Sequence, residues 1–390
     1  MIQVSQALSI IEANTCKMPI QKIKVVKSLG FILAEAIYSP MDMPPFRQSA
    51  MDGYAFLHDG SSVFELAGIS QAGDFLNRKT ENQQAIRIFT GAFVPDDLDT
   101  VVMQEHTSRS GDSLIINKMP VPFTNIRKKG EQLKEKALVL KVNTLINPAA
   151  IGLLACLGIT EIKVFAKPKV AIVVSGNELV KVGNKLAEGK IYESNSLMLE
   201  AALQEIGIKK IKTFAVKDNL KATIIVLKGC LSSFDIVLVS GGISVGDYDY
   251  VKEALLSNGV EELFYTINQK PGKPLFFGKK EDTLVFALPG NPASALTNFY
   301  IYVYPALKIS MGFEVSHLPE IKRKITTSFK NTSGKTLFLK AIYDDKNVRI
   351  LGSQSSAMLN TFALANALIC LPPDVMSIEK DQEVVVIPLN

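Results

Sequence analysis

Residues 235–251 read "DIVLVSGGISVGDYDYV": an apolar run, a glycine-rich loop and the start of a helical pattern. Two further segments have the same order, "KVAIVVSGNEL" at 169–179 and "TLVFALPGNPAS" at 283–294. Strands that are apolar throughout are buried on both faces, and their alternation with helical patterns such as residues 220–233 indicates a doubly wound sheet. The sequence therefore predicts an α/β domain with a mostly parallel sheet over residues 168–310.

The loops that follow these strands carry glycines, carboxylates and hydroxyls, and ligands of an open parallel sheet bind at the carboxyl ends of its strands. The spacing from Gly241 to Gly246 matches the first half of a phosphate-binding motif, but Asp247 stands where that motif has a lysine. Taken singly, each glycine fits an ordinary turn and each aspartate a helix cap. Together on one sheet edge they favour a phosphate held by backbone N–H groups, with Mg²⁺ as cofactor on the carboxylates. The candidate residues are Glu178, Asp218, Gly241, Gly242, Ser244, Gly246, Asp247, Asp249, Gly290, Asn291 and Ser294.

Positive charge follows downstream in "KPGKP", residues 270–274. The prolines and the glycine restrict this loop, so Lys270 and Lys273 can be presented at a fixed spacing. The alternative is a solvated turn between strands. A further turn signal, Asp52-Gly53, predicts a plain hairpin, and the residues alone give it no functional role.

The rest of the chain has a different hydrophobic pattern from the α/β domain. Residues 45–140 and 311–390 contain short alternating runs broken by Gly, Asp and Pro, which predict two small β-domains. Residues 1–44 and 141–167 are expected to form a mixed N-terminal domain into which the first β-domain is inserted. A helix in this domain is predicted to begin with Asn147 as its N-cap.

Composition excludes several classes of function. The 390 residues carry a net charge of +5 without a basic run interleaved with aromatics, so no nucleic-acid partner is expected. The N-terminus lacks a signal-peptide pattern, and no apolar run reaches the roughly 18 residues of a membrane span, so a cytoplasmic protein without a membrane partner is expected.

Cysteines and histidines are few and scattered, without a C-x-x-C pair. Zinc sites and histidine-based triads therefore have almost no residues to form them, and any catalysis is expected to rest on carboxylates, lysines, hydroxyls and a hard metal ion. The residues concerned are Cys16, Cys156, Cys230, Cys370, His58, His106 and His317.

A set of motifs along nearly the whole chain resembles one known family. In order, they are "MDGYAF", "TGAFVP", "SGNELV", "SGGISVGDYDYV", "KPGKPLFFG" and "LPGNPASA". This order is similar to that of the molybdopterin molybdenumtransferases, the MoeA and gephyrin E-domain family. The resemblance is weakest in the C-terminal tail.

The resemblance implies an elongated homodimer of four-domain subunits. Members take adenylylated molybdopterin and molybdate, cleave the pyrophosphate link with the assistance of Mg²⁺, release AMP and leave molybdenum on the dithiolene sulfurs. The site is expected in a cleft between the central domain of one subunit and the "MDGYA" domain of the other. A molybdopterin adenylyltransferase is expected as a further partner.

Matched motif by motif, the resemblance also assigns roles to single residues. It implies catalytic roles for Asp52, Glu178, Asp218 and Asp249, with Asp218 and Asp249 as metal ligands. It implies substrate binding by Thr90 and by the loop residues given above. The groups expected near molybdate are Lys270, Lys273, Ser294, Lys340 and Ser356.

Two positions depart from the family pattern. Gln132 stands where relatives commonly have Asp, and Lys340 stands where they have Arg, which would have offered an oxyanion a bidentate fork.

Two rival functions remain open. An ATP-dependent molybdopterin adenylyltransferase would resemble only residues 168–310, and a non-catalytic molybdopterin-binding scaffold would bind the ligand without releasing AMP.

Overall fold

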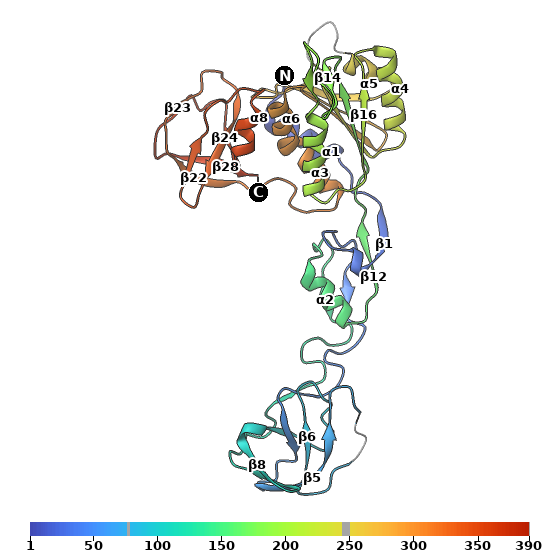
Figure 1. Ribbon diagram of the computed structural model, residues 1–390, viewed down its shortest axis with the longest axis vertical. Coiled ribbons are helices and arrows are strands. Elements are labelled where there is room, and N and C mark those ends of the chain that lie inside the picture. The colour runs from blue at the N-terminus through green and yellow to red at the C-terminus, as the bar shows by residue number, and fades with distance from the viewer. Residues whose placement is uncertain (76–78, 244–249, 390) are drawn as a thin grey trace. The chain divides into compact units, whose positions relative to one another are not determined.

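The computed structural model describes residues 1–75, 79–243 and 250–389 (Figure 1). These residues form two compact units. The large unit comprises Met1–Lys22, Gly30–Ala34 and Lys163–Asn390, and the small unit comprises Ile23–Leu29 and Glu35–Ile162. The finer division into four domains stays a prediction. Across the described ranges, no helix is both long enough and apolar enough to cross a membrane.

The large unit is built on a six-stranded sheet of order β16-β13-β17-β21-β20-β18. The first three pairings are parallel, and β20 pairs antiparallel with both β21 and β18, so the predicted mostly parallel sheet is confirmed. The strands are β13 (Val170–Ser175), β16 (Ile211–Val216), β17 (Ile236–Ser240), β18 (Glu261–Thr266), β20 (Pro274–Lys280) and β21 (Thr283–Leu288).

Helices cover both faces of this sheet, because each central strand sends alternate apolar side chains to opposite sides (Figure 1). Ile172 and Leu238 belong to the core shared with one group of helices, whereas Val173 and Val239 belong to the core shared with the other. The first group is α1 (Val4–Asn14), α3 (Asn195–Glu205), α6 (Pro292–Asn298), the π-helix η3 (Phe299–Val303) and α7 (Tyr304–Ser310); the second is α4 (Leu220–Leu231) and α5 (Val251–Ser257).

The C-terminal part of the large unit is a second six-stranded sheet, of order β19-β24-β25-β22-β28-β26. Because β24 also pairs with β26, five of these strands close into a ring around an apolar core. The predicted C-terminal β-domain is therefore barrel-like. Its elements are β19 (Gln269–Lys270), β22 (Ile321–Ile325), β23 (Phe329–Lys330), β24 (Thr336–Tyr343), β25 (Asn347–Ile350), α8 (Leu359–Leu364), β26 (Ala367–Leu371), β27 (Ser377–Ile378) and β28 (Glu383–Pro388).

The small unit contains a third six-stranded sheet, of order β7-β4-β6-β5-β9-β8. The helix expected after Asn147 is present, and the Asn147 side chain accepts a hydrogen bond from the Ala150 N–H, as an N-cap does. The elements that lie wholly in this unit are η1 (Val25–Lys27), β2 (Ile37–Tyr38), β3 (Gln48–Ser49), β4 (Gly53–Phe56), β5 (Val63–Ser70), β6 (Gln84–Ile88), β7 (Thr100–Met103), η2 (Gln104–His106), β8 (Thr107–Ser110), β9 (Ser113–Ile116), β10 (Ile126–Arg127), β11 (Leu138–Leu140) and α2 (Pro148–Cys156). Separately, β1 (Ile20–Lys24) pairs with β12 (Glu161–Phe165).

Candidate functional site

A cavity of about 640 Å³ lies at the carboxyl ends of the parallel strands in the large unit. We call it the strand-end cavity. It is where the sheet topology predicts a ligand. Of the residues singled out in the sequence, those lining it are Glu178, Asp218, Gly241, Gly242, Gly290 and Asn291.

Asp218 ties two of the strand-end loops together. Its carboxylate accepts hydrogen bonds from Ser175 Oγ at 2.8 Å and from the Asn177 N–H at 2.9 Å. Its own N–H donates to Asn177 Oδ1 at 3.3 Å. A carboxylate has about four acceptor positions, so Asp218 retains acceptor capacity for a ligand.

Glu178 lies in the loop after β13 with an exposed side chain. Gly176 leaves room for it, because a Cβ at residue 176 would lie 2.8 Å from Glu178 Oε2. The small ribbon formed by β14 (Leu179–Val180) and β15 (Ile191–Tyr192) follows, and its residues Leu179, Ile191 and Tyr192 line one wall of the strand-end cavity.

The paired glycines after β17 are required by close backbone approach. Gly241 has φ +94°, and a Cβ there would lie 2.5 Å from the Ser175 carbonyl oxygen. Gly242 has φ +65°, and a Cβ there would lie 2.7 Å from Val251 Cγ2 on α5. Only glycine accepts both the left-handed backbone and the contact, so the loop packs directly on β13 and α5.

Asn195, which the sequence analysis missed, also lines the strand-end cavity. Its Nδ2 donates to Ser240 Oγ and to the Gly290 carbonyl, both at 2.8 Å, and so joins the ends of β17 and β21. Its Oδ1 is buried and has no hydrogen-bond partner within the described part of the chain. The signal that could have revealed it is the polar run "ESNS" at 193–196, where α3 begins.

A second cavity, of about 500 Å³, adjoins the first and is lined by lysines and hydroxyls. We call it the lysine cavity. Both cavities share Pro274, Pro289 and Asn291 in their walls. Of the residues expected near molybdate, Lys270, Lys273, Ser294 and Ser356 line the lysine cavity, together with Lys335, which the sequence analysis missed.

The C-terminal barrel supplies part of this second cavity. Asn291 Nδ2 donates to Ser356 Oγ at 3.1 Å, which fixes the turn of Ser356 against the start of α6. Lys340 lies behind this turn and is not among the residues that line the lysine cavity. Its ammonium is buried and donates to the carbonyls of Ser355 and Met358, both at 3.1 Å, and burial lowers its pKa. In this structure Lys340 therefore supports the turn that carries Ser356.

In the small unit, the predicted residues Asp52 and Thr90 are brought together. Asp52 Oδ1 accepts hydrogen bonds from the Thr90 N–H at 2.7 Å and from its hydroxyl at 2.8 Å. These bonds hold the pKa of the exposed Asp52 carboxyl below its ordinary value, and the nearby Arg87 adds a smaller effect in the same direction. The side chain of Asp52 is thus ionised and oriented.

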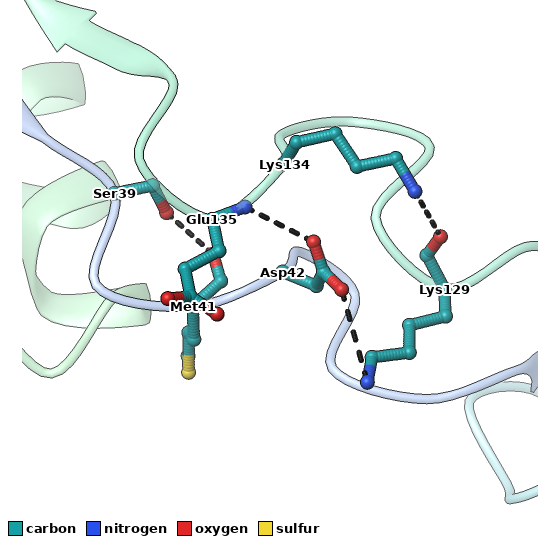
Figure 2. Close-up of polar contacts among 6 residues, drawn as sticks. All are labelled: Ser39, Met41, Asp42, Lys129, Lys134 and Glu135. Carbon is teal, nitrogen blue, oxygen red and sulfur yellow. Dashed lines mark hydrogen bonds and ion pairs between the residues drawn. The ribbon is translucent and has the colours of Figure 1, made fainter.

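Asp42 anchors the loop of residues 129–135, to which Gln132 belongs, and Figure 2 shows the contacts of Asp42 with Lys129 and Glu135. Asp42 Oδ1 accepts from the Glu135 N–H at 3.0 Å, and Asp42 Oδ2 lies 3.7 Å from Lys129 Nζ. Gln132 lines a cavity of about 610 Å³ within the small unit, beside Arg127. At residue 132 this cavity is therefore lined by an uncharged side chain.

Four of the predicted residues, Ser244, Gly246, Asp247 and Asp249, lie outside the described residues. Among the described residues, no group of three or more His, Cys, Asp or Glu side chains could hold a metal ion by itself. Glu178 and Asp218 nevertheless line one cavity, and Mg²⁺ needs only one or two carboxylates when substrate phosphates and water complete its shell. The donor set fits a magnesium ion that binds together with a phosphate ligand.

Comparisons with known proteins agree with this architecture. Family models match residues 2–158 (MoeA N-terminal region, domain I and II), 171–309 (probable molybdopterin binding domain) and 322–389 (MoeA C-terminal region, domain IV). Two structures of the molybdopterin biosynthesis MoeA protein from Pyrococcus horikoshii superpose with TM-scores of 0.86 and 0.82, at 28% and 26% identity. Both cover 100% of this chain and at least 99% of their own.

Curated relatives lead to the same family. The chain is 34% identical over 369 residues to the molybdopterin molybdenumtransferase of Haemophilus influenzae, covering 92% of this chain and 91% of the relative. It is 32% identical over 373 residues to molybdopterin molybdenumtransferase 2 of Mycobacterium tuberculosis, covering 91% and 92%. The three matched regions, and relatives matched over more than nine-tenths of their length, show that the chain belongs to the molybdopterin molybdenumtransferase family, which acts in the biosynthesis of the molybdenum cofactor.

Proposed function

We propose that this enzyme inserts molybdenum from molybdate into adenylylated molybdopterin, with Mg²⁺-dependent cleavage of the pyrophosphate link and release of AMP. The observation that carries the proposal is the pair of adjoining cavities in the large unit. One contains carboxylates and glycine loops, and the other contains lysines and hydroxyls. Two cavities with these linings suit a reaction in which a phosphate-bearing substrate binds next to an oxyanion.

The strand-end cavity would hold the pyrophosphate and the pterin. Without side chains at the strand-end glycines, phosphate oxygens could approach the loop backbone closely, although the Gly241 N–H itself donates to the Leu288 carbonyl at 3.2 Å. Glu178 and Asp218, with Asp249, would hold Mg²⁺, which when bound neutralises phosphate charge and stabilises the charge that develops on the leaving group. No protein side chain needs to form a covalent bond, because positioning and electrostatics suffice for such a cleavage.

The lysine cavity would hold molybdate. Lys270, Lys273 and Lys335 provide cationic donors, and Ser294 and Ser356 provide hydroxyl donors. Hydrogen bonds from cations to an oxyanion are about twice as strong as neutral ones, so this lining favours a tetrahedral dianion over a neutral ligand. Because both cavities share Asn291 in their walls, an oxyanion in the lysine cavity would lie next to the strand-end cavity, where the dithiolene of the pterin would receive the metal.

We also propose a homodimer in which the small unit of one subunit completes the site of the other. The support is chemical: Asp52 is exposed, oriented by Thr90 and held ionised, and its carboxylate retains acceptor capacity for a ligand. A molybdopterin adenylyltransferase would supply the adenylylated substrate.

The test is AMP release from purified adenylylated molybdopterin, with and without Mg²⁺ and molybdate, using Asp249→Ala as the comparison. We expect release that requires the metal, rises with molybdate and is lost in the variant. Binding without release would leave a scaffold, and consumption of ATP with free molybdopterin would indicate an adenylyltransferase.

A further inference from the structure

Three large polar side chains are buried directly beneath the lysine loop, residues 270–273. Gln269 is 1% exposed, and Asn298 and Tyr302 are 0% exposed. Burial of such groups is strongly unfavourable unless each donor and acceptor is paired. Their pairing is therefore a determinant of the local structure.

The three side chains pair with one another and with the lysine loop. Gln269 Nε2 donates to Asn298 Oδ1 at 2.7 Å, and also to the loop carbonyls of Pro271 at 3.0 Å and Gly272 at 3.3 Å. Asn298 Nδ2 donates to the same Gly272 carbonyl at 3.2 Å. The Tyr302 hydroxyl donates to Gln269 Oε1, which fixes the orientation of the Gln269 amide.

The loop cannot move away from this network without breaking it. Gly272 has φ +80°, and a Cβ there would lie 2.6 Å from Asn298 Oδ1, so the loop backbone packs directly on the Asn298 amide. Lys270 and Lys273 flank the two bonded carbonyls, and both line the lysine cavity. The network therefore fixes the backbone positions from which the two lysine side chains extend.

The network also joins the loop to the helix that carries Ser294. Ser294 and Asn298 lie on α6 with i,i+4 spacing, and Tyr302 follows four residues later in the π-helix η3. A π-helical turn is rare and often occurs at functional sites. Burial holds the pKa of the Tyr302 phenol well above its ordinary value, so the hydroxyl remains a donor at working pH.

We propose that Gln269, Asn298 and Tyr302 are positioning residues that hold the lysine loop and Ser294 in register for binding an oxyanion. This inference rests on the proposed function of the lysine cavity. It predicts that weakening the network lowers oxyanion affinity and leaves the strand-end cavity unaffected, since none of the three residues lines the strand-end cavity, whereas Gln269 lines the lysine cavity. A network that merely stabilises the core would lower thermal stability without this selectivity.

The experiment compares Tyr302→Phe with Tyr300→Phe in the full-length protein. Each variant removes one hydroxyl from the same π-helical turn, but Tyr300 stacks on Phe362 and takes no part in the network. For each we would measure the KM for molybdate and kcat in AMP release, and by calorimetry the Kd of molybdate alone and of AMP alone. Gln269→Met serves as the second variant, because it removes the donors to both loop carbonyls at similar volume.

We expect Tyr302→Phe to raise the KM and Kd for molybdate about tenfold, the effect of losing one buried hydrogen bond. Gln269→Met, which loses several hydrogen bonds, should raise both at least as much. The kcat and the Kd for AMP should stay within twofold, and Tyr300→Phe should match the wild type. Unchanged molybdate affinity in a destabilised Tyr302→Phe or Gln269→Met protein, or equal losses for molybdate and AMP, would overturn the inference. If the wild type binds molybdate but releases no AMP, the proposed reaction fails, while the calorimetric comparison still decides the role of the network.

Discussion

Gly241→Ala tests whether the glycine loop after β17 is built for close backbone contact. Gly241 has φ +94°, and so does Gly183, which lies in an open loop where an added Cβ meets nothing within 4 Å. The two substitutions therefore impose the same left-handed strain, about 1–2 kcal/mol. Only at residue 241 does the new Cβ also meet the Ser175 carbonyl oxygen, at 2.5 Å.

The magnitude follows from that contact. The Ser175 carbonyl must retreat from 2.5 Å to at least 3.0 Å, and it belongs to a buried strand that cannot move freely. Overpacking of this kind destabilises by about 1–3 kcal/mol in addition to the backbone strain. We expect Gly241→Ala to lose about 2–5 kcal/mol and Gly183→Ala about 1–2 kcal/mol of unfolding free energy.

Urea unfolding monitored by circular dichroism measures both changes, and AMP binding by calorimetry reports on the cavity. Displacement of the loop should weaken AMP binding at least tenfold in Gly241→Ala and leave it within twofold in Gly183→Ala. Equal effects of the two substitutions on stability and on AMP binding would refute the reasoning, because they share the strain and differ only in the contact.

Three further predictions concern single charges. Lys273→Met should raise the KM for molybdate about tenfold with little change in the Kd for AMP, measured as above, whereas Lys221→Met on the exposed side of α4 should change neither. Asp218→Asn places an amide N–H₂ against one of the donors Ser175 and Asn177, so urea unfolding should show a loss of about 1–2 kcal/mol, and AMP release should need about tenfold more Mg²⁺. Burial, and secondarily a neighbouring lysine, lowers the pKa of Lys308 to about 8, so the unfolded state binds this proton more tightly and stability should rise as pH increases from about 8 to about 10. At pH 7 the Lys308→Met variant should therefore be more stable than the wild type, by up to about 1 kcal/mol because the group is half exposed. A difference in unfolding free energy that is as large at pH 10 as at pH 7 would contradict this.

The sequence was sufficient for the parts of the fold that bury continuous apolar runs. The strands β13, β17 and β21 and the helices around them lie where the alternation of patterns placed them. The strands β18 and β20 were not predicted, because "EELFYT" is polar at its start and β20 begins at a proline that was read as part of a loop. An edge hairpin of this kind lacks the doubly buried pattern of the central strands.

Some functional residues could likewise be predicted from the sequence, and others could not. Strand-end position was enough to place Glu178, Asp218 and Gly241 in one cavity. Asn195 could not be found this way, because its contacts join it to residues 45 and 95 positions further along the chain. Lys340 was predicted to bind molybdate because it matches an arginine of relatives. In the structure its ammonium instead donates to backbone carbonyls behind the lysine cavity, a result of packing that the sequence alone does not reveal.

The measurement that tests the central claim most directly is the amount of molybdenum retained on the pterin for each AMP released by the wild-type protein at saturating molybdate and Mg²⁺. If the adjoining cavities act in one reaction, the ratio should be about one molybdenum per AMP, and Lys273→Met should approach it only at higher molybdate concentration. AMP release that proceeds at the same rate without molybdate, and leaves no metal on the pterin, would contradict the account.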